Sequence, residues 1–170
     1  MKRALVIGAS GGIGAAVQEE LVSRGYAVTG LSRSGDGLDV TDEESVAHAL
    51  GALEPGYDLI LVATGALVID GAEPEKTIRR VTARAMADQF ALNCIGPSLV
   101  LKHSLRLMPR DRRAVFAALS ARVGSIGDNA LGGWYSYRTA KAALNQMIHT
   151  GAIELARSHR HAVCVALHPG

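Results

Sequence analysis

A tyrosine and a lysine four positions apart, Tyr137 and Lys141, form the pair in this sequence best suited to chemistry. On a helix this spacing stacks the two side chains on one face. A tyrosine hydroxyl ordinarily titrates at about pH 10, and an ammonium group one turn away favours the phenolate and lowers that pKa. Such a tyrosine can exchange a proton with an alcohol or carbonyl oxygen near neutral pH. The spacing alone is more often that of an ordinary surface pair.

A glycine-rich loop near the start of the chain has the context of a phosphate-binding loop. It runs from Gly8 to Gly14 (GASGGIG), after the apolar run Ala4-Leu5-Val6-Ile7 and before a segment of helical periodicity. Glycines let the backbone approach a pyrophosphate, and a helix N-terminus offers free N–H groups and a positive dipole end. The spacing GxxxGxG differs from the strict GxGxxG fingerprint, so a plain turn between strand and helix remains an alternative.

The residues after the second apolar run bear on the choice of cofactor. About 20 residues beyond Gly14 an acid would bind the ribose 2′-hydroxyl of NAD, whereas an arginine would accept the 2′-phosphate of NADP. The chain has Ser32-Arg33-Ser34 there, with no acid before Asp36. Arg33 can pair with a phosphate through two hydrogen bonds, so the sequence favours NADP(H) over NAD(H). A solvated loop cation is the other interpretation of Arg33.

Apolar runs alternate with helical patterns along the whole chain. This predicts a doubly wound parallel sheet between two helical layers, a Rossmann-type three-layer α/β fold. Thr41 and Glu44 have the spacing of a capping box, and Pro97 should bend the helix that contains it. The loop 120–134 is long enough to be functional. The predicted strands are 3–8, 26–32, 38–40, 57–63, 114–119 and 162–167, and the predicted helices are 12–24, 41–53, 83–108 and 135–157.

Composition narrows the possible partners. The 170 residues predict one domain, which is 48% hydrophobic and has a net charge of +2. Lysines and arginines are scattered among acids, which argues against nucleic-acid binding. Cys94 and Cys164 match no metal-ligand spacing, and no apolar run reaches the ~18 residues of a membrane span. The sequence therefore predicts a soluble, cytoplasmic protein without a metal site or a membrane partner.

Taken together and in order, these motifs resemble the short-chain dehydrogenase/reductase family over essentially all 170 residues. GASGGIG resembles its TGxxxGIG loop, with Ile7 in place of threonine, and YSYRTAK resembles its YxASK motif. Val62-Ala63-Thr64-Gly65 aligns with its Asn-Asn-Ala-Gly turn, where only Gly65 matches. Further similarities are Leu38-Asp39-Val40, Asn93 and Pro169-Gly170. The stretch 120–141 is most similar to the sniffer/C-factor-like branch.

The resemblance implies roles for these residues. Tyr137 would be the acid/base, Lys141 would lower its pKa and bind the nicotinamide ribose, and Asn93 would hold a proton-relay water. The implied cofactor-binding residues are Gly8, Ser10, Gly11, Gly12, Ile13, Gly14, Ser32, Arg33, Asp39, Val40, Ala63, Thr64, Gly65, Tyr137, Lys141, Pro169 and Gly170.

The serine that orients the substrate in this family departs from its usual position. It normally stands three residues before the loop glycine, here Gly124, and that position is Ala121. We expect Ser120 to supply the hydroxyl. Ser125, or no serine at all, are the alternatives. A missing hydroxyl would weaken carbonyl binding.

The predicted function is an NADP(H)-dependent oxidoreductase that transfers hydride between the nicotinamide and a small carbonyl or alcohol substrate. The alternative, motivated by Ala121, is a non-catalytic NADP(H)-binding sensor or signalling protein of the same fold. Members of the family pair through two long helices, so we expect a homodimer or homotetramer. The substrate loop that usually follows the Pro-Gly pair is expected beyond Gly170.

Overall fold

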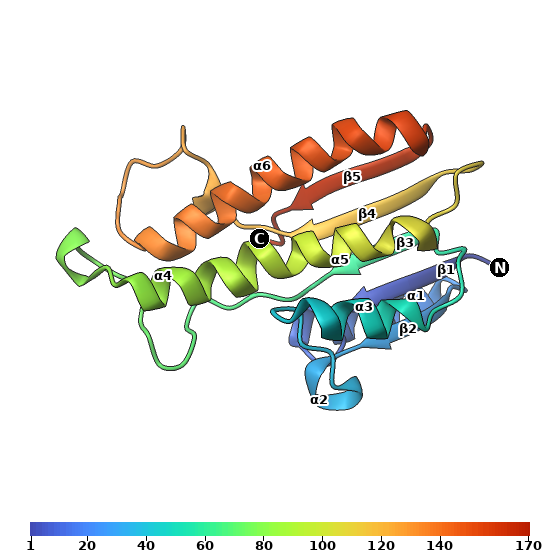
Figure 1. The fold of residues 1–170 in the computed structure, drawn as a ribbon, viewed down its shortest axis with the longest axis horizontal. Helices are drawn as coiled ribbons and strands as arrows, with labels where there is room; N and C mark the ends of the chain where they lie inside the picture. Colours follow the sequence, from blue (N-terminus) through green and yellow to red (C-terminus); the bar gives the residue numbers. More distant parts are fainter.

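Five parallel strands form the centre of the computed structural model, which describes all residues from Met1 to Gly170. Their order across the sheet is β2-β1-β3-β4-β5, so the chain moves outward from β1 in both directions (Figure 1). The predicted doubly wound sheet is therefore confirmed. The strands are β1 (Arg3–Ile7), β2 (Ala27–Leu31), β3 (Leu59–Val62), β4 (Ala114–Leu119) and β5 (Ala162–Leu167).

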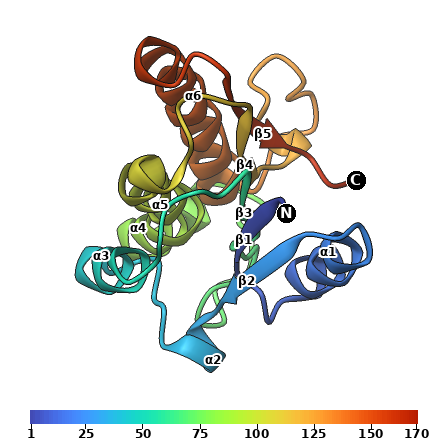
Figure 2. The same cartoon turned by 90° about the vertical axis from the view of Figure 1, so that its right-hand side faces the viewer.

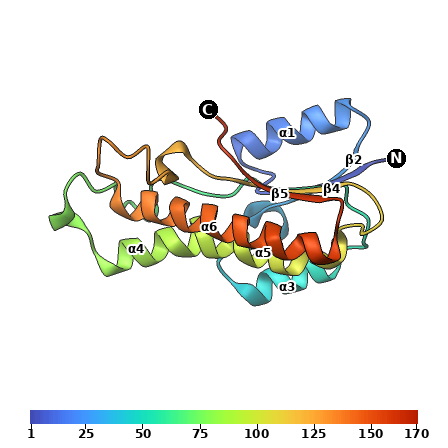
Figure 3. The ribbon, with the colours of Figure 1, turned by 90° about the horizontal axis from the view of Figure 1, so that it is seen from above.

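Helices cover both faces of the sheet and complete the three layers. Figures 2 and 3 show α1 on one face and α3, α5 and α6 on the other. The segment α4 continues the line of α5 beyond the end of the sheet to which the strands point (Figure 1). The α-helices are α1 (Gly12–Ser23), α2 (Arg33–Asp36), α3 (Glu43–Gly51), α4 (Ala83–Phe90), α5 (Gly96–Ser104) and α6 (Tyr135–Ser158).

Alternate residues of each central strand point to opposite faces, and both faces are buried. In β1, Leu5 and Ile7 belong to the larger core cluster, with Val46 of α3 and Val100 of α5. The neighbouring β1 residues Ala4 and Val6 belong to a smaller cluster with Leu21 of α1. This two-sided burial explains why the strands are continuous apolar runs and could be located from sequence.

Residues 38–40, predicted as a short strand, do not join the sheet. Gly37 has φ +70 and turns the chain after α2. The Asp39 carboxylate then accepts the N–H of Thr41 at 2.9 Å and its hydroxyl at 2.7 Å, which holds a local turn instead of a strand ladder. The predicted cap is also wrong by one residue, because Asp42 precedes α3 and accepts the N–H of Glu44 at 3.0 Å.

The predicted helix 83–108 is interrupted by a π-helical turn, Ala91–Ile95. Pro97, in the first turn of α5, has no N–H to donate to the carbonyl four residues earlier, which is that of Asn93. The chain widens just before the proline, and a single turn of 3-10 helix, Leu105–Leu107, ends the segment. The π turn buries the Asn93 side chain completely.

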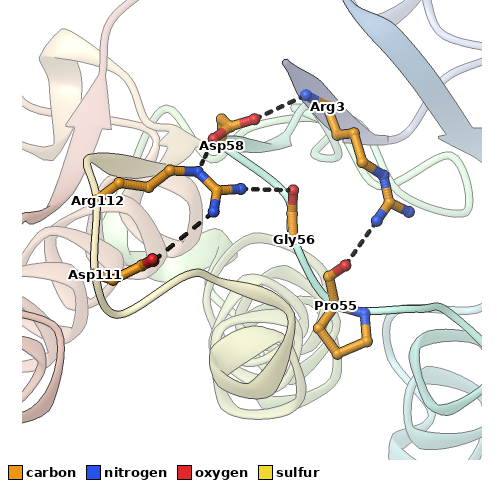
Figure 4. Close-up of polar contacts among 6 residues, drawn as sticks. All are labelled: Arg3, Pro55, Gly56, Asp58, Asp111 and Arg112. Carbon is orange, nitrogen blue, oxygen red and sulfur yellow. Dashed lines mark hydrogen bonds and ion pairs between the residues drawn. The ribbon is translucent and has the colours of Figure 1, made fainter. Parts of the chain in front are cut away.

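A cluster of charges fixes the opposite end of the sheet, where the strands begin (Figure 4). Asp58 accepts the backbone N–H of Arg3 at 2.8 Å and pairs with the guanidinium of Arg112 at 2.9 Å. Burial acts to raise the pKa of Asp58, but these two donors together hold it below its usual value. The cluster ties β1 to the segments that lead into β3 and β4, so it stabilises the sheet at the end away from the site.

Candidate active site

A cleft of about 540 Å³ opens at the carboxyl ends of the strands. It lies where β1 and β3 are neighbours and the strand order reverses, which is where ligands bind in such sheets. Most of the predicted cofactor residues line it. The predicted cofactor residues that do not line it are Gly12, Ile13, Gly14, Tyr137, Lys141, Pro169 and Gly170. Those that do are Gly8, Ser10, Gly11, Ser32, Arg33, Asp39, Val40, Ala63, Thr64 and Gly65.

The glycine loop is shaped by close contact between its own residues. Gly8 has φ +87, a conformation that side-chain-bearing residues rarely adopt. Gly14 packs so closely on it that a Cβ there would overlap the Gly8 carbonyl oxygen. Gly11 precedes α1, and no side-chain hydrogen bond caps the start of this helix. The loop therefore has the form that a pyrophosphate requires, close backbone at an uncapped helix start.

The residues after β2 place the Arg33 side chain at the cleft without an ion-pair partner. Asp36, the nearest acid, is directed back to Ser32 and accepts its backbone N–H at 2.8 Å. The Ser32 hydroxyl accepts the N–H of Gly35 at 3.0 Å and so caps α2. Arg33 is exposed, lines the cleft and takes part in none of the ion pairs of the structure. Arg33 therefore brings to the cleft a positive charge that forms no ion pair, although it is near enough to Asp39 to help lower the pKa of that carboxyl.

Tyr137 and Lys141 lie on one face of α6, as their spacing predicts. The Lys141 ammonium nitrogen is 5.7 Å from the centre of the Tyr137 ring and donates to the carbonyl of Leu119, at the end of β4, at 2.9 Å. Burial raises the pKa of Tyr137, which is half-buried, and no hydrogen bond to its hydroxyl offsets this. This corrects the prediction that Lys141 lowers the Tyr137 pKa, because burial of the hydroxyl dominates and the ammonium bonds to the Leu119 carbonyl instead.

Burial also acts on the lysine and gives a testable consequence for stability. Lys141 is 2% exposed, and burial lowers its pKa to about 8. Between that value and its ordinary pKa, near 10.5, the unfolded chain binds a proton that the folded chain does not. Stability relative to a Lys141→Met variant should therefore rise with pH across this window, by up to about 3 kcal/mol. Urea unfolding of both proteins from pH 7 to 10 measures this, and a pH-independent difference would contradict it.

Asn93 faces Lys141 across Gly65. Its amide nitrogen donates to the Ala66 carbonyl at 3.0 Å and to the side-chain oxygen of Gln89 at 2.7 Å. Its own oxygen, Oδ1, is buried and has no partner. A Cβ added to Gly65 would lie 2.8 Å from Asn93 Oδ1 and 3.2 Å from Lys141 Nζ, so only glycine leaves the space between them open. The unpaired oxygen and the ammonium thus face the same small space.

The Ser120 hydroxyl is engaged by α6. It donates to Oδ1 of Asn145 at 2.6 Å, and Asn145 also donates weakly to the Gly124 carbonyl at 3.4 Å. Ala121 follows in extended backbone, at φ −148 and ψ 149, so its side chain points away from that of Ser120. Ser125 is exposed and accepts the N–H of Asp128. Because the Ser120 proton is already donated, the predicted role of Ser120 would require this bond to break.

Two side chains at the site were missed from sequence, Gln89 and Asn145. Gln89 is four residues before Asn93, and Asn145 is four residues after Lys141. In each case the helical spacing from a predicted site residue was the signal that could have found them.

Comparison with known proteins identifies this arrangement. A sequence model of the short chain dehydrogenase family matches residues 2–170. The chain belongs to this family. Among characterised members, it is 33% identical over 164 residues to 1-hydroxy-2-glutathionyl-2-methyl-3-butene dehydrogenase of Rhodococcus sp. (strain AD45), covering 86% of this chain and 68% of that one. It is 28% identical to the 3-oxoacyl-[acyl-carrier-protein] reductase FabG of Aquifex aeolicus, covering 99% and 73%.

A solved family member also carries a cofactor. A Burkholderia multivorans protein described as a short-chain dehydrogenase/reductase with bound NADP superposes with a TM-score of 0.83 at 26% identity, covering 99% of this chain and 79% of that one. The sniffer/C-factor-like branch is loosely supported. The C-signal protein of Myxococcus xanthus is 35% identical over 85 residues, half of each chain, and the carbonyl reductase Sniffer of D. melanogaster, at 21% identity and TM-score 0.76, shares the fold.

The family settles the broad class of activity. The relatives are named dehydrogenases and reductases, so the chain is an oxidoreductase of the kind that acts on CH–OH and C=O groups with a nicotinamide cofactor. None of its helices is long and apolar enough to cross a membrane.

Proposed function

We propose that this protein interconverts a small carbonyl compound and its alcohol with NADP(H), using Tyr137 as the acid/base. The observation that carries the proposal is that Lys141 and Asn93 meet at Gly65, which lines the cleft, while the Tyr137 ring lies 5.7 Å from the Lys141 ammonium nitrogen. NADPH oxidation by the purified protein, with benzaldehyde, cyclohexanone and phenanthrenequinone as carbonyl probes, tests it. Absence of turnover with every probe, despite NADPH binding, would count against it.

The cofactor would lie along the cleft. The glycine loop and the start of α1 would hold its pyrophosphate, Asp39 and Val40 would contact the adenine side, and Lys141 would bind the nicotinamide ribose. The Thr64 hydroxyl at the cleft is buried and has no partner in the protein, which leaves it free to bind the ligand. When bound, NADP(H) supplies or accepts the hydride.

The chain's own residues would handle the proton. Because burial raises its pKa, the Tyr137 hydroxyl is protonated at neutral pH and can donate to a carbonyl oxygen during reduction. The unpartnered oxygen of Asn93 can hold a water molecule, through which Lys141 would return the proton to the site. Ser120 would orient the substrate oxygen only after releasing Asn145, so we expect weaker carbonyl binding than a free serine would give.

The preference for NADP(H) is proposed from Arg33. An Arg33→Ala variant should bind NADPH about 10- to 100-fold more weakly, because a charge-assisted bond to the 2′-phosphate is lost. NADH binding should not change. Titration of both cofactors into the wild type, the variant and an Arg160→Ala control, an exposed arginine outside the cleft, measures this. Unchanged NADPH affinity in Arg33→Ala would contradict the assignment.

We also propose that the protein is a homodimer or homotetramer, paired through the long helices. Sedimentation equilibrium should give a multiple of the 17.8 kDa chain mass. A monomeric mass at micromolar concentration would refute the proposal.

A further inference from the structure

The helix that carries Tyr137 is capped by a residue from a distant loop. Trp134 precedes α6 with φ +54 and supplies no side-chain cap. Instead, Glu75 accepts the backbone N–H of Ser136 at 3.2 Å, and the Ser136 hydroxyl donates to its other carboxylate oxygen. The backbone carbonyl of Glu75 accepts the N–H of Trp134 at 2.6 Å. One loop residue thus satisfies donors on both sides of the helix start.

The Glu75 carboxylate is an unusual choice for a simple cap. It is 6% exposed and forms no ion pair with a lysine or arginine. Burial acts to raise its pKa, but the bonds from Ser136 and the backbone keep the pKa below its usual value, so the carboxylate is ionised. A buried unpaired charge is costly, and a serine or aspartate at position 134 would cap the helix without that cost.

Glu75 lies beside Tyr137, so its buried carboxylate can act on the site. Glu75, Ser136 and Tyr137 line one small cavity between the 67–75 segment, α4 and α6. The Trp134 ring meets the Tyr137 ring edge-on, with centres 6.4 Å apart and planes at 71°. The Glu75 carboxylate therefore fixes Ser136, which precedes Tyr137 in the first turn of α6, and the Glu75 backbone carbonyl fixes Trp134, whose ring contacts the Tyr137 ring.

The same loop is tied to Asn93. Gln89 donates to the carbonyl of Leu67 at 2.8 Å while its side-chain oxygen accepts from the Asn93 amide at 2.7 Å. The segment 67–75 is thus anchored at one end beside Asn93 and at the other beside Tyr137. The segment therefore connects the π turn, which carries Asn93, to α6, which carries Tyr137.

We propose that Glu75 is a positioning residue for the reaction, which fixes the Tyr137 ring through its bonds to Ser136 and Trp134. The proposal rests on the proposed role of Tyr137. Trp134 has a strained left-handed backbone, which persists only where its surroundings hold it. The backbone carbonyl of Glu75 bonds to the Trp134 N–H, and the Glu75 carboxylate holds that carbonyl in place through its two bonds to Ser136. Loss of the carboxylate should loosen the first turn of α6 and leave the glycine loop unaffected.

A double-mutant cycle tests this. Glu75→Gln, Ser136→Ala and the double variant are compared with the wild type for NADPH-dependent reduction of phenanthrenequinone, and NADPH affinity is followed by quenching of Trp134, the single tryptophan. We expect Glu75→Gln to lower kcat roughly 10- to 100-fold, since small displacements of a catalytic group have effects of that size. The Kd for NADPH should stay within about twofold. The kcat of the double variant should be no lower than that of the slower single variant, because both changes break the same contact between Glu75 and Ser136.

Glu73→Gln is the matched control, since Glu73 is an exposed acid two positions away in the same loop. It should keep wild-type kcat. An unchanged kcat in Glu75→Gln, additive losses in the cycle, or a loss of NADPH affinity in parallel with kcat would each overturn the proposal. If Glu75→Gln does not fold, Ser136→Ala takes its place. A lowered kcat at constant Kd would then support the proposal, and an unchanged kcat would overturn it. Activity retained in Tyr137→Phe would instead remove the proposed acid/base role of Tyr137, whatever the Glu75 variants do.

Discussion

A Tyr137→Phe variant should reduce carbonyl probes about a thousandfold more slowly than the wild type, the size of effect expected when a general acid is removed. The ring and its edge-on contact with Trp134 are kept, so the change removes only the hydroxyl. The Tyr137 hydroxyl has no hydrogen-bond partner within the chain, so removing the hydroxyl should leave folding unaffected. NADPH affinity should also stay the same. Steady-state kinetics with phenanthrenequinone, together with NADPH titration, give both quantities.

Tyr135→Phe is the control for this variant, because Tyr135 is the neighbouring tyrosine on the same helix and is also partly buried. It should retain wild-type rates. A Tyr137→Phe rate within about threefold of the wild type would show that the proton comes from elsewhere, since a hydroxyl at the reacting oxygen contributes far more than that.

A Gly14→Ala variant should lose NADPH binding by about 100-fold or more, equivalent to about 3 kcal/mol. The added methyl group would overlap the carbonyl oxygen of Gly8, which is backbone and cannot rotate away. The loop between β1 and α1 must then open, and the cradle for the pyrophosphate is lost. The same overlap should lower the free energy of unfolding by about 2–3 kcal/mol.

Gly51→Ala, in α3, separates this overlap from the general effect of removing a glycine. A Cβ at Gly51 meets nothing within 4 Å, so this variant should bind NADPH normally and be slightly more stable. Titration calorimetry and urea unfolding of both variants measure the contrast. Wild-type affinity in Gly14→Ala would show that the loop does not hold the cofactor.

The sheet could be predicted from sequence because its strands are buried on both faces. Such strands are apolar along their whole length, as Leu59–Val62 and Ala114–Leu119 are. The segment 38–40 was misassigned because Leu38 and Val40 are buried like strand residues, yet Asp39 bonds locally to Thr41. Periodicity records burial, and it does not distinguish a buried turn from a strand of three residues.

The site was predictable where its residues are close in sequence. The four-residue spacing of Tyr137 and Lys141 brings them together on any helix. Glu75 was not found, since its partner Ser136 lies 61 residues away and only the tertiary fold joins them. The pKa of Tyr137 was predicted in the wrong direction because the sequence shows the lysine nearby but not the burial of the Tyr137 hydroxyl, which raises its pKa.

The central claim, that this cleft carries out NADPH-dependent carbonyl reduction through Tyr137, is tested most directly by single-turnover NADPH oxidation. Wild-type protein and Tyr137→Phe are each mixed with NADPH and phenanthrenequinone, with protein in excess over NADPH. We predict oxidation of the bound NADPH by the wild type and none above background by the variant, at equal NADPH affinity. Tight NADPH binding with no oxidation by either protein would contradict the account and favour a protein that binds the cofactor without catalysis.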